Sequence, residues 1–567
     1  MPAPSSSPTS PVADSHSRRW PWVAVAAALI ALKLWLVSAQ TIFAIGYANH
    51  DDALFLNRAA ALLHGEWLGT YDQLTLAHAP AYPFFIVGAY LLHVPLFTAQ
   101  QLLYAAGCGL LIVALRPLIA SRPLRFAVFT VLLYNPVTFD SVIHGRVMRQ
   151  NILPGLALLI LAGCIGLHAR RAAPLRRLWP WLLLLAAALP AFWLTRNESV
   201  WILPCVGLLV AATILAGWRE GQPDRLRRLA LLAIPAAGWA AGLLTVSAIN
   251  WRYYGVFTTT EFKQADFNAA YGALTRVEPA HWRQFIPVPR EVRERLYPLS
   301  PAFAELQPHL EGELGEAWAG ISETVHHIPA KEREIGAGWF MWTLRDAVIR
   351  AGHGQTGGDV AVYYRRLARE VNEACDRGLI KAGPHRSGFL PPLRHEHLEP
   401  FKQSAWSALK MLVSFDQMAV RSSPSEGSDA DLAFFAKHTR GRLSPPADNR
   451  EPKARPVWLE EARLDILDGI RRLYAAFAPW AGIASLAALV AAWIGAIVRR
   501  RLPFFAVAGS GLLGSMLALV AIVALVDSTS FPALNTGYLS GSYGLWLLFL
   551  FTGWLALVEA WRGNGQR

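Results

Sequence analysis

The chain has 567 residues, of which 54% are hydrophobic and 16% are charged, and its formal net charge is +13. Soluble domains carry about 25% charged residues, so this composition excludes an ordinary water-soluble protein. The apolar residues come in blocks of about 17 to 25, the length that crosses a hydrocarbon core as a helix. Much of the basic excess lies in short loops beside these blocks, where membrane topology explains it. No nucleic-acid partner is therefore expected.

The chain begins with a Ser/Pro-rich stretch, residues 1–17, which predicts a disordered tail. About ten membrane spans follow from hydropathy and charge. They are predicted at Trp20–Phe43, Leu102–Ile119, Pro123–Phe139, Ile152–His168, Leu178–Leu194, Val200–Trp218, Leu229–Ile249, Trp480–Val498, Leu502–Val526 and Leu545–Trp561. The first block is too long for the core of a signal peptide, so we interpret it as a helix.

One further apolar stretch, Tyr82–Phe97, could span the membrane or lie at its surface. If it does not span, the basic clusters between spans all fall on one side, which the positive-inside rule makes the cytoplasm. Pro83 and Pro95 also interrupt it. We therefore expect a juxtamembrane or re-entrant helix on the outer face, with both termini cytoplasmic.

The predicted fold class is mainly α: a polytopic membrane helix bundle of about ten spans plus juxtamembrane helices, with a largely helical extracytoplasmic insertion. A helix at Trp458–Tyr474 is expected to pack down onto the membrane face. Only Cys375 of the four cysteines lies in the insertion, so no disulfide framework is available there. The predicted regions are a cytoplasmic tail (1–17), a membrane domain (18–249) with a first outer loop (44–81), the insertion (250–479), C-terminal membrane helices (480–561) and a cytoplasmic tail (562–567).

Chemistry is predicted first at Asp51 and Asp52, which follow His50 directly after the first span. One interpretation is a helix cap, because aspartate at a helix start accepts backbone N–H bonds. Two adjacent carboxylates beside a histidine exceed what one cap requires. They would suit a general base that deprotonates a hydroxyl, or a pair that binds a cation or an amine.

The pattern from His50-Asp-Asp-Ala-Leu-Phe55, through Leu63-His-Gly-Glu-Trp-Leu-Gly-Thr-Tyr-Asp72, to His78-Ala-Pro-Ala-Tyr-Pro-Phe-Phe85 resembles the first outer loop of the GT-C superfamily. These integral-membrane glycosyltransferases use polyprenyl-phosphate sugars and include the protein O-mannosyltransferase and aminoarabinose transferase branch. The resemblance covers Trp20 to about Gln100 and the general architecture of the membrane half. It implies Asp51 as catalytic base, Asp52 in the second acidic position, and His78 near the lipid phosphate, with His50 and Tyr82 lining the cavity.

The second outer loop adds Arg146 and Arg149. They could simply meet lipid headgroups. Spaced three apart, they would share an outward-facing helical face, against the charge bias that fixed the topology. Arginine suits bidentate recognition of phosphate, so we expect these two residues to bind the donor phosphate.

Two other polar clusters lie near the outer surface. Arg196 and Glu198 interrupt an apolar run, where they could pair to turn the chain or line the donor cavity, because ionisable groups at membrane depth usually face a cavity. Arg252 lies among aromatics at the end of the seventh span, either in an aromatic belt or within reach of the same phosphate. The histidines of the insertion have weak metal spacing, and no metal site is assigned to them.

The leading hypothesis is therefore a glycosyltransferase of the bacterial inner (plasma) membrane, with a polyprenyl-phosphate sugar as donor and a lipid, glycan or protein as acceptor. No cofactor is certain, and a divalent cation at Asp51 and Asp52 remains an open alternative. The second hypothesis is a transporter or a lipid or glycan flippase, although we see no repeated halves. A third is a degenerate member that binds lipid or partners without chemistry.

Overall fold

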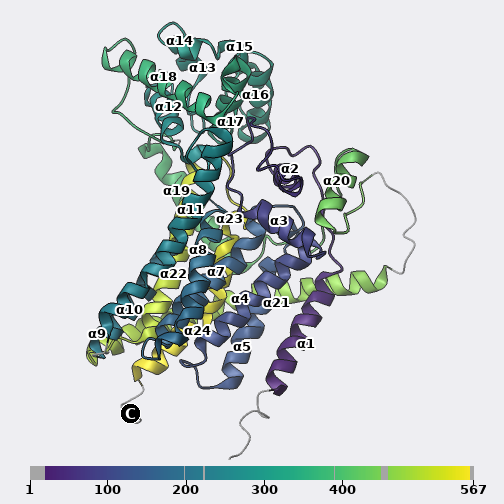
Figure 1. Ribbon diagram of the computed structural model, residues 1–567, viewed down its shortest axis with the longest axis vertical. Helices are drawn as coiled ribbons and strands as arrows, with labels where there is room; N and C mark the ends of the chain where they lie inside the picture. The colour runs from purple at the N-terminus through teal and green to yellow at the C-terminus, as the bar shows by residue number, and fades with distance from the viewer. Residues whose placement is uncertain (1–19, 197, 221–223, 389, 448–456, 562–567) are drawn as a thin grey trace, which may run out of the picture.

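The computed structural model describes residues 20–196, 198–220, 224–388, 390–447 and 457–561. The tails predicted at 1–17 and 562–567 lie outside these residues. Helices build the described chain, which contains isolated β-bridges but no named strand (Figure 1). The predicted all-helical polytopic fold is thus confirmed.

Eight helices among the described residues are long and apolar enough to cross a membrane. They fall at Leu96–Leu115, Arg149–Ala169, Leu175–Trp193, Ser199–Arg219, Arg225–Tyr254, Trp458–Val498, Phe504–Thr529 and Thr536–Trp561. The other two predicted spans contain the shorter helices α1 (Trp20–Val37) and α5 (Arg122–Leu133). A continuous helix over Pro123–Phe139 is wrong, because Pro136 opens a separate 3₁₀ turn, η1 (Pro136–Phe139).

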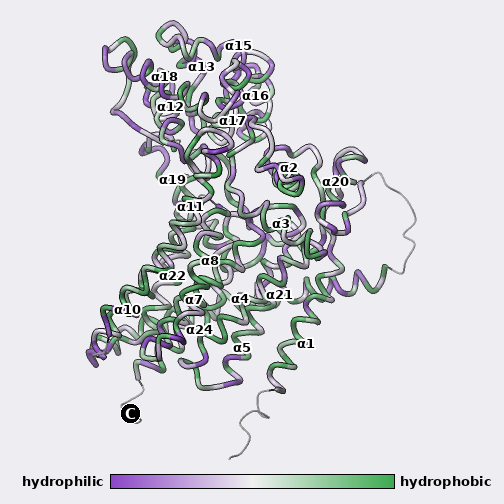
Figure 2. The backbone as a smooth tube through the Cα atoms, in the orientation of Figure 1, coloured by the Kyte–Doolittle hydropathy of each residue, from purple (hydrophilic) through white to green (hydrophobic). Residues whose placement is uncertain are grey.

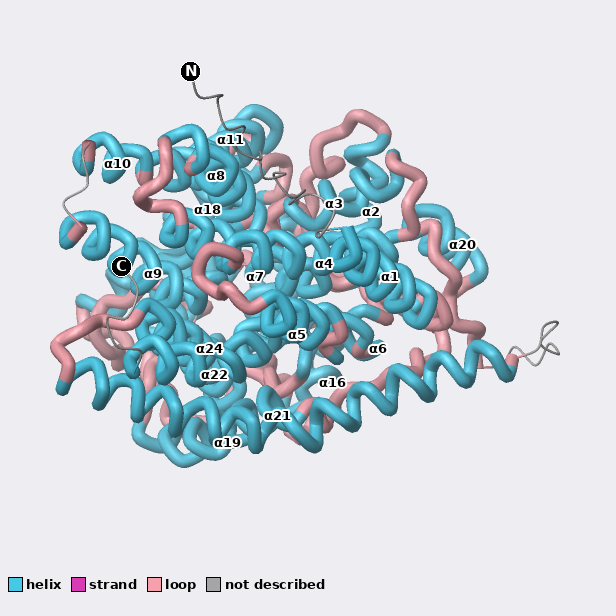
Figure 3. The backbone as a smooth tube through the Cα atoms, turned by 90° about the horizontal axis from the view of Figure 1, so that it is seen from below, coloured by secondary structure: helices cyan, strands magenta, loops and turns pink. Residues whose placement is uncertain are grey.

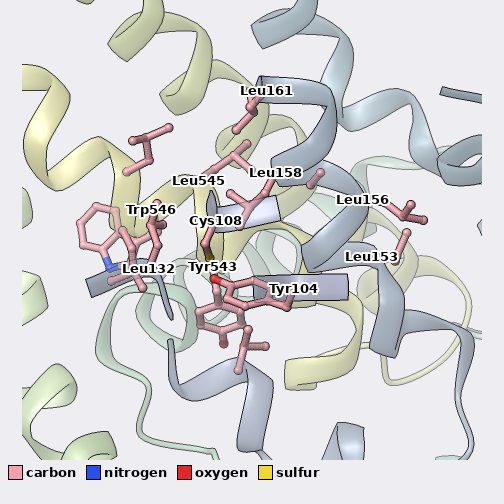
Figure 4. Packing of buried hydrophobic residues seen from close by; sticks show 14 of the residues in the cluster. Tyr104, Cys108, Leu132, Leu153, Leu156, Leu158, Leu161, Tyr543, Leu545 and Trp546 are labelled. Carbon is pink, nitrogen blue, oxygen red and sulfur yellow. The ribbon is translucent and has the colours of Figure 1, made fainter. Parts of the chain in front are cut away.

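The bundle has one apolar core that draws on almost all of its helices. Besides α1 and α5, the helices of the bundle are α4 (Leu96–Leu115), α7 (Leu153–Ala169), α8 (Trp179–Trp193), α9 (Leu203–Arg219), α10 (Arg225–Leu231), α11 (Ala233–Tyr254), α21 (Trp458–Val498), α22 (Phe504–Thr529) and α24 (Tyr543–Trp561). In Figure 4, Tyr104 and Cys108 of α4 lie beside Leu158 of α7 and Tyr543 of α24. Small residues permit such close approach: a Cβ atom on Gly482 would lie 1.9 Å from the Trp546 ring.

The insertion contains a second core with its own helices. These are α12 (Ala265–Arg276), α13 (Arg290–Leu296), α14 (Pro301–Ala304), α15 (Gln307–Leu310), α16 (Glu313–His326), α17 (Ala337–Val348) and α18 (Gly357–Asp376). They lie at one end of the bundle, and the hydropathy colouring of Figure 2 shows more polar backbone there than around the spans. Ala77 of the first outer loop is buried in this second core, so that loop packs against the insertion.

The later part of the insertion returns to the bundle. Buried residues of α19 (Leu398–Ser414) belong to the bundle core, and α20 (Asp429–Thr439) lies near the first outer loop. The predicted helix Trp458–Tyr474 and the span after it form one 41-residue helix, α21, with Pro479 inside it. At 1.5 Å per residue this helix is about 60 Å long, twice a hydrocarbon core, and Figure 3 shows it running along the edge of the molecule.

Short helices also lie in the segments between the long ones: α2 (Asp52–Leu63), α3 (Ala81–Leu91) and α6 (Ser141–His144), with α23 (Thr536–Leu539) before α24. The stretch that had two interpretations, Tyr82–Phe97, contains the 11-residue α3, and then α4 starts at Leu96. Eleven residues rise only about 16 Å, so α3 is too short to cross a membrane.

Candidate functional site

The acidic pair lies where the first outer loop enters α2. Asp51 is the residue before the helix and makes no side-chain cap hydrogen bond, so the cap interpretation of this residue fails. Its side chain is 50% exposed. Asp52, in the first turn of α2, has a fully buried side chain. Two neighbouring carboxylates thus have different surroundings, one open and one enclosed.

Arg146 joins the two carboxylates. Its Nε donates to Asp52 Oδ1 at 3.3 Å and Oδ2 at 3.1 Å, and its Nη2 also donates to Oδ2. The same Nη2 lies 3.7 Å from Asp51 Oδ2. The backbone N–H of Val147 donates to Asp52 Oδ1 at 3.0 Å. Both carboxylate oxygens of Asp52 therefore accept hydrogen bonds, and this residue holds Arg146 in place. Asp51 is the carboxylate that remains open to a ligand.

The contacts of Asp52 and Arg146 with each other determine whether these two side chains are ionised. Burial raises the pKa of Asp52, an effect that Arg146 opposes. Burial alone would lower the pKa of Arg146, but the Asp52 carboxylate raises it. Bidentate geometry and the Val147 N–H both favour the ionised carboxylate. We therefore describe Asp52 and Arg146 as an ion pair.

Arg149 opens a 3₁₀ turn, η2 (Arg149–Ile152), whereas Arg146 lies in a bend after α6. The expectation that they share one helical face is wrong, because Gly145 to Met148 are not helical. Arg149 nonetheless lies within electrostatic range of Asp51, as well as of Arg196 and Glu198. Its Nη1 is buried and has no hydrogen-bond partner among the described residues. This unpartnered donor belongs to a guanidinium within electrostatic range of Asp51.

Arg196 and Glu198 form the pair that the sequence allowed, with Nε donating to Oε2 at 3.1 Å. The Arg196 guanidinium also stacks over the Tyr538 ring, 4.5 Å from its centroid. Burial alone would raise the pKa of Glu198, but Arg196 and Arg149 lower it to about 2. The turn between two spans and the second outer loop therefore meet in one cationic cluster that contains an ionised glutamate.

His78 is enclosed by aromatic rings. It stacks on Phe55 at 5.5 Å and meets the edge of Trp342 at 5.8 Å. Burial, together with Arg149 and Arg196, lowers the pKa of His78 well below its ordinary value. The imidazole is therefore neutral near pH 7, and it would contact a phosphate through a hydrogen bond rather than through charge. Its Nδ1 is buried without a partner in the described part of the chain.

His50 lies between two tryptophans of the insertion, with ring centroids 5.3 Å from Trp318 and 5.0 Å from Trp342. Burial lowers the pKa of His50, although Asp51 opposes the effect. Trp342 of α17 thus contacts both His50, beside the carboxylates, and His78, beside the arginines. No feature of the sequence marked Trp342.

The two remaining predicted residues, Tyr82 and Arg252, differ in burial and in position. Tyr82 is fully buried, meets Phe55 edge-on at 5.3 Å and accepts a hydrogen bond at 3.1 Å from Gln100. It therefore lies in the wall behind α2. Arg252 is exposed near the end of α11, and in the described part of the chain no hydrogen bond or ion pair joins it to Asp51, Arg146 or Arg149.

The insertion contributes charged residues that the sequence did not single out. Arg345 is fully buried, and its Nη2 donates to Thr75 O at 2.7 Å and to the Glu261 carboxylate. A third hydrogen bond runs from its Nη1 to Gln73 O. Arg345 therefore fastens the first outer loop to the insertion. Contacts across such sequence distances leave no periodic trace, so no local pattern could have found them.

Lys263 is the second such residue. It ends the short turn η5 (Glu261–Lys263) and lies within electrostatic range of Glu198 and Arg149. Burial lowers the pKa of Lys263. The nearby charge of Glu198 raises this pKa, and that of Arg149 lowers it. The insertion thereby adds a further basic side chain to the cluster around Arg149.

Metal ligands were considered at the acidic pair. Among the described residues, no group of three or more His, Cys, Asp or Glu side chains could hold a metal ion. Arg146 and the Val147 N–H already engage both oxygens of Asp52. A divalent cation shared by Asp51 and Asp52 would have to displace this arginine, and it stays a prediction.

Comparison with known proteins gives a distant structural similarity. The chain is similar to ArnT from Cupriavidus metallidurans in the apo state, at 16% identity and a TM-score of 0.33, over 96% of this chain and 78% of that chain. It is also similar to the same protein bound to undecaprenyl phosphate, at 15% identity and a TM-score of 0.30, with the same coverage. No family model matches the chain, and no curated protein sequence matches it. At this similarity, we base function on the contacts of the acidic pair and its arginines.

Proposed function

We propose that the chain is a membrane glycosyltransferase that moves a sugar from a polyprenyl-phosphate donor to an acceptor hydroxyl on the extracytoplasmic side. One observation carries the proposal: the open carboxylate of Asp51 lies beside Arg146 and within electrostatic range of Arg149, whose buried Nη1 has no partner among the described residues. A base next to unsatisfied guanidinium donors suits a reaction that takes a proton from one oxygen and leaves charge on another.

Asp51 accepts the proton of the acceptor hydroxyl as the hydroxyl oxygen attacks the anomeric carbon of the donor sugar. The bond between that carbon and the phosphate oxygen breaks, and the electron pair leaves with the phosphate. Arg149 and Arg146 stabilise the charge that develops on the leaving group, more strongly in a site of low dielectric constant than in water. A single displacement inverts the configuration at this carbon.

The other residues set this geometry. Asp52 holds Arg146 in place, Arg196 and Lys263 add positive charge, and neutral His78 offers a ring nitrogen. Arg252 remains a proposed outer contact for the phosphate. The acceptor is a lipid, a glycan or a protein, and we propose the bacterial inner membrane as the site of the reaction, with the insertion on its outer side.

The test measures sugar transfer by the full chain in lipid vesicles supplied with polyprenyl-phosphate sugars, together with donor binding. Asp51→Asn should lower turnover by about 100-fold or more, the usual range for a general base, while donor binding persists. Asp429→Asn is the matched control, because Asp429 is exposed and, like Asp51, lies at the start of a helix.

Arg149→Gln should weaken donor binding, because it removes the unpartnered donor. Unchanged turnover in Asp51→Asn would exclude it as the base. Vesicles that move the lipid-linked sugar across the bilayer without transferring it, and lose this flux in Asp51→Asn, would show a transporter instead.

A further inference from the structure

A cavity of about 60 Å³ lies between helices of the bundle. Two of these helices, α9 and α10, lie at the end of the bundle opposite the insertion (Figure 1). The walls of the cavity come from α7, α8, α9, α10 and the loop after α7. Apolar side chains such as Leu167, Leu182 and Ile214 line the cavity together with three arginines, Arg171, Arg225 and Arg228. None of these residues belongs to the site around Asp51.

Two of the arginines retain unused donors. Arg228 Nη1 donates to the backbone oxygens of Arg171 and Ala173, at 2.6 Å and 3.0 Å, which fixes the side chain. Its Nε is buried and has no partner among the described residues. Arg225 is exposed, and its guanidinium lies 6.0 Å from the centroid of the Trp218 ring.

Acidic neighbours do not cancel this charge. Glu220 pairs with Arg171, so Arg171 contributes little free positive charge. Asp224 precedes Arg225, and it makes no side-chain cap hydrogen bond to α10. Arg225 and Arg228 are one helical turn apart, so both can approach a single anionic group.

Two of the helical segments around the cavity leave most of their apolar surface uncovered by protein. Only 28% of the most apolar window of the Ser199–Arg219 helix is buried, and only 11% of that of Arg225–Tyr254. The cavity exceeds the roughly 10 to 15 Å³ that one water needs, but the apolar part of its lining offers water no hydrogen-bond partners. An acyl chain fills that part without loss of hydrogen bonds. Basic pockets at the ends of spans attract anionic headgroups, and guanidinium groups bind phosphate oxygens in pairs.

We infer that this cavity binds one anionic phospholipid, with part of an acyl chain between Leu182 and Ile214 and the phosphate on Arg225 and Arg228. The site is separate from the proposed glycosyl transfer and does not depend on it. Its ligand is a lipid rather than a free phosphate, because most of the lining is apolar.

The experiment measures lipid binding to the full chain in detergent by native mass spectrometry, with phosphatidylglycerol and phosphatidylcholine as probes. Phosphatidylglycerol should bind at least tenfold more tightly than phosphatidylcholine. Combining Arg225→Gln and Arg228→Gln should remove this preference. Arg227→Gln, on the same helix but outside the lining, should leave it unchanged.

A second variant separates the cavity from surface charge. Ile214→Trp fills the cavity with all arginines intact and should weaken phosphatidylglycerol binding, while the thermal unfolding temperature shows that the chain still folds. Binding that is equally strong in the double arginine variant, or in Ile214→Trp, would overturn the inference. Displacement of the lipid by millimolar inorganic phosphate would overturn it as well, because the site would then be one for a free anion.

Discussion

Arg345 allows a quantitative test of how the insertion holds the first outer loop. Its side chain is fully buried, and the Glu261 carboxylate that it contacts is 3% exposed. Burial alone would lower the pKa of Arg345, but Glu261 raises it. Arg345→Met keeps much of the side-chain volume and leaves a buried carboxylate that still accepts a hydrogen bond from the Tyr71 hydroxyl, at 2.9 Å.

Removing one partner of a buried ion pair costs about 3 to 5 kcal/mol. At 1.36 kcal/mol per factor of ten, the loop should open about 160- to 5000-fold more often. Hydrogen exchange of the backbone amides from Thr70 to Ala77 measures this opening. Arg350→Gln is the matched control: the Arg350–Asp346 pair in the same domain has an arginine that is 52% exposed, and pairs of this kind contribute only about 0.3 to 0.5 kcal/mol.

Adding Glu261→Gln to Arg345→Met should recover part of the protection, since the uncompensated charge is then gone. If exchange in Arg345→Met matches that of Arg350→Gln, the loop is not held by this pair. Equal exchange in the single and double variants would show that the backbone contacts to Gln73 and Thr75 matter, and that the charge of Glu261 does not.

Three further predictions concern the bundle and the acidic pair. Arg146→Met should destabilise the chain by about 3 to 5 kcal/mol, because Asp52 is left buried and unpaired, and Asp52→Asn in the same chain should restore part of the unfolding temperature; no recovery would argue against the ion pair. Burial raises the pKa of Asp140 from 3.8 to about 6, so its contribution to stability is complete below pH 4 and decreases as the pH rises to about 6. The change corresponds to roughly 3 kcal/mol at 1.36 kcal/mol per pKa unit, and unfolding measured across this range should show a smaller slope for Asp140→Asn than for the parent chain. Finally, transfer activity should persist in EDTA because Arg146 occupies Asp52; activity that is lost and then restored by Mg²⁺ or Mn²⁺ would place a cation at the acidic pair.

The sequence predicted the membrane bundle well, because hydropathy and basic loops report on individual segments. It failed where one residue changes a helix locally: Pro136 ends α5 early, whereas Pro479 does not interrupt α21. Proline removes a backbone donor in both cases. Packing around each helix decides whether the chain can tolerate that loss, and packing is not visible in a local pattern.

The candidate site was only partly predictable. Adjacency marked Asp51 and Asp52 together, but burial and Arg146 separate them into an open carboxylate and a structural partner. Trp342 and Lys263 come from the insertion, where apolar and charged residues mix without a distinctive pattern. Their importance follows from interactions with residues 65 to 292 positions away, and a single sequence contains no record of those interactions.

The first outer loop completes its packing late in synthesis. Arg345 is 272 positions after Gln73, whose backbone oxygen it binds. At roughly 5 to 20 residues per second, the ribosome needs about 15 to 55 s to make the intervening chain. During that time Arg345 is not yet present to bind the loop, and the core of the insertion, in which Ala77 is buried, is incomplete. The order of synthesis therefore leaves this loop without its buried arginine until Arg345 has been added to the chain.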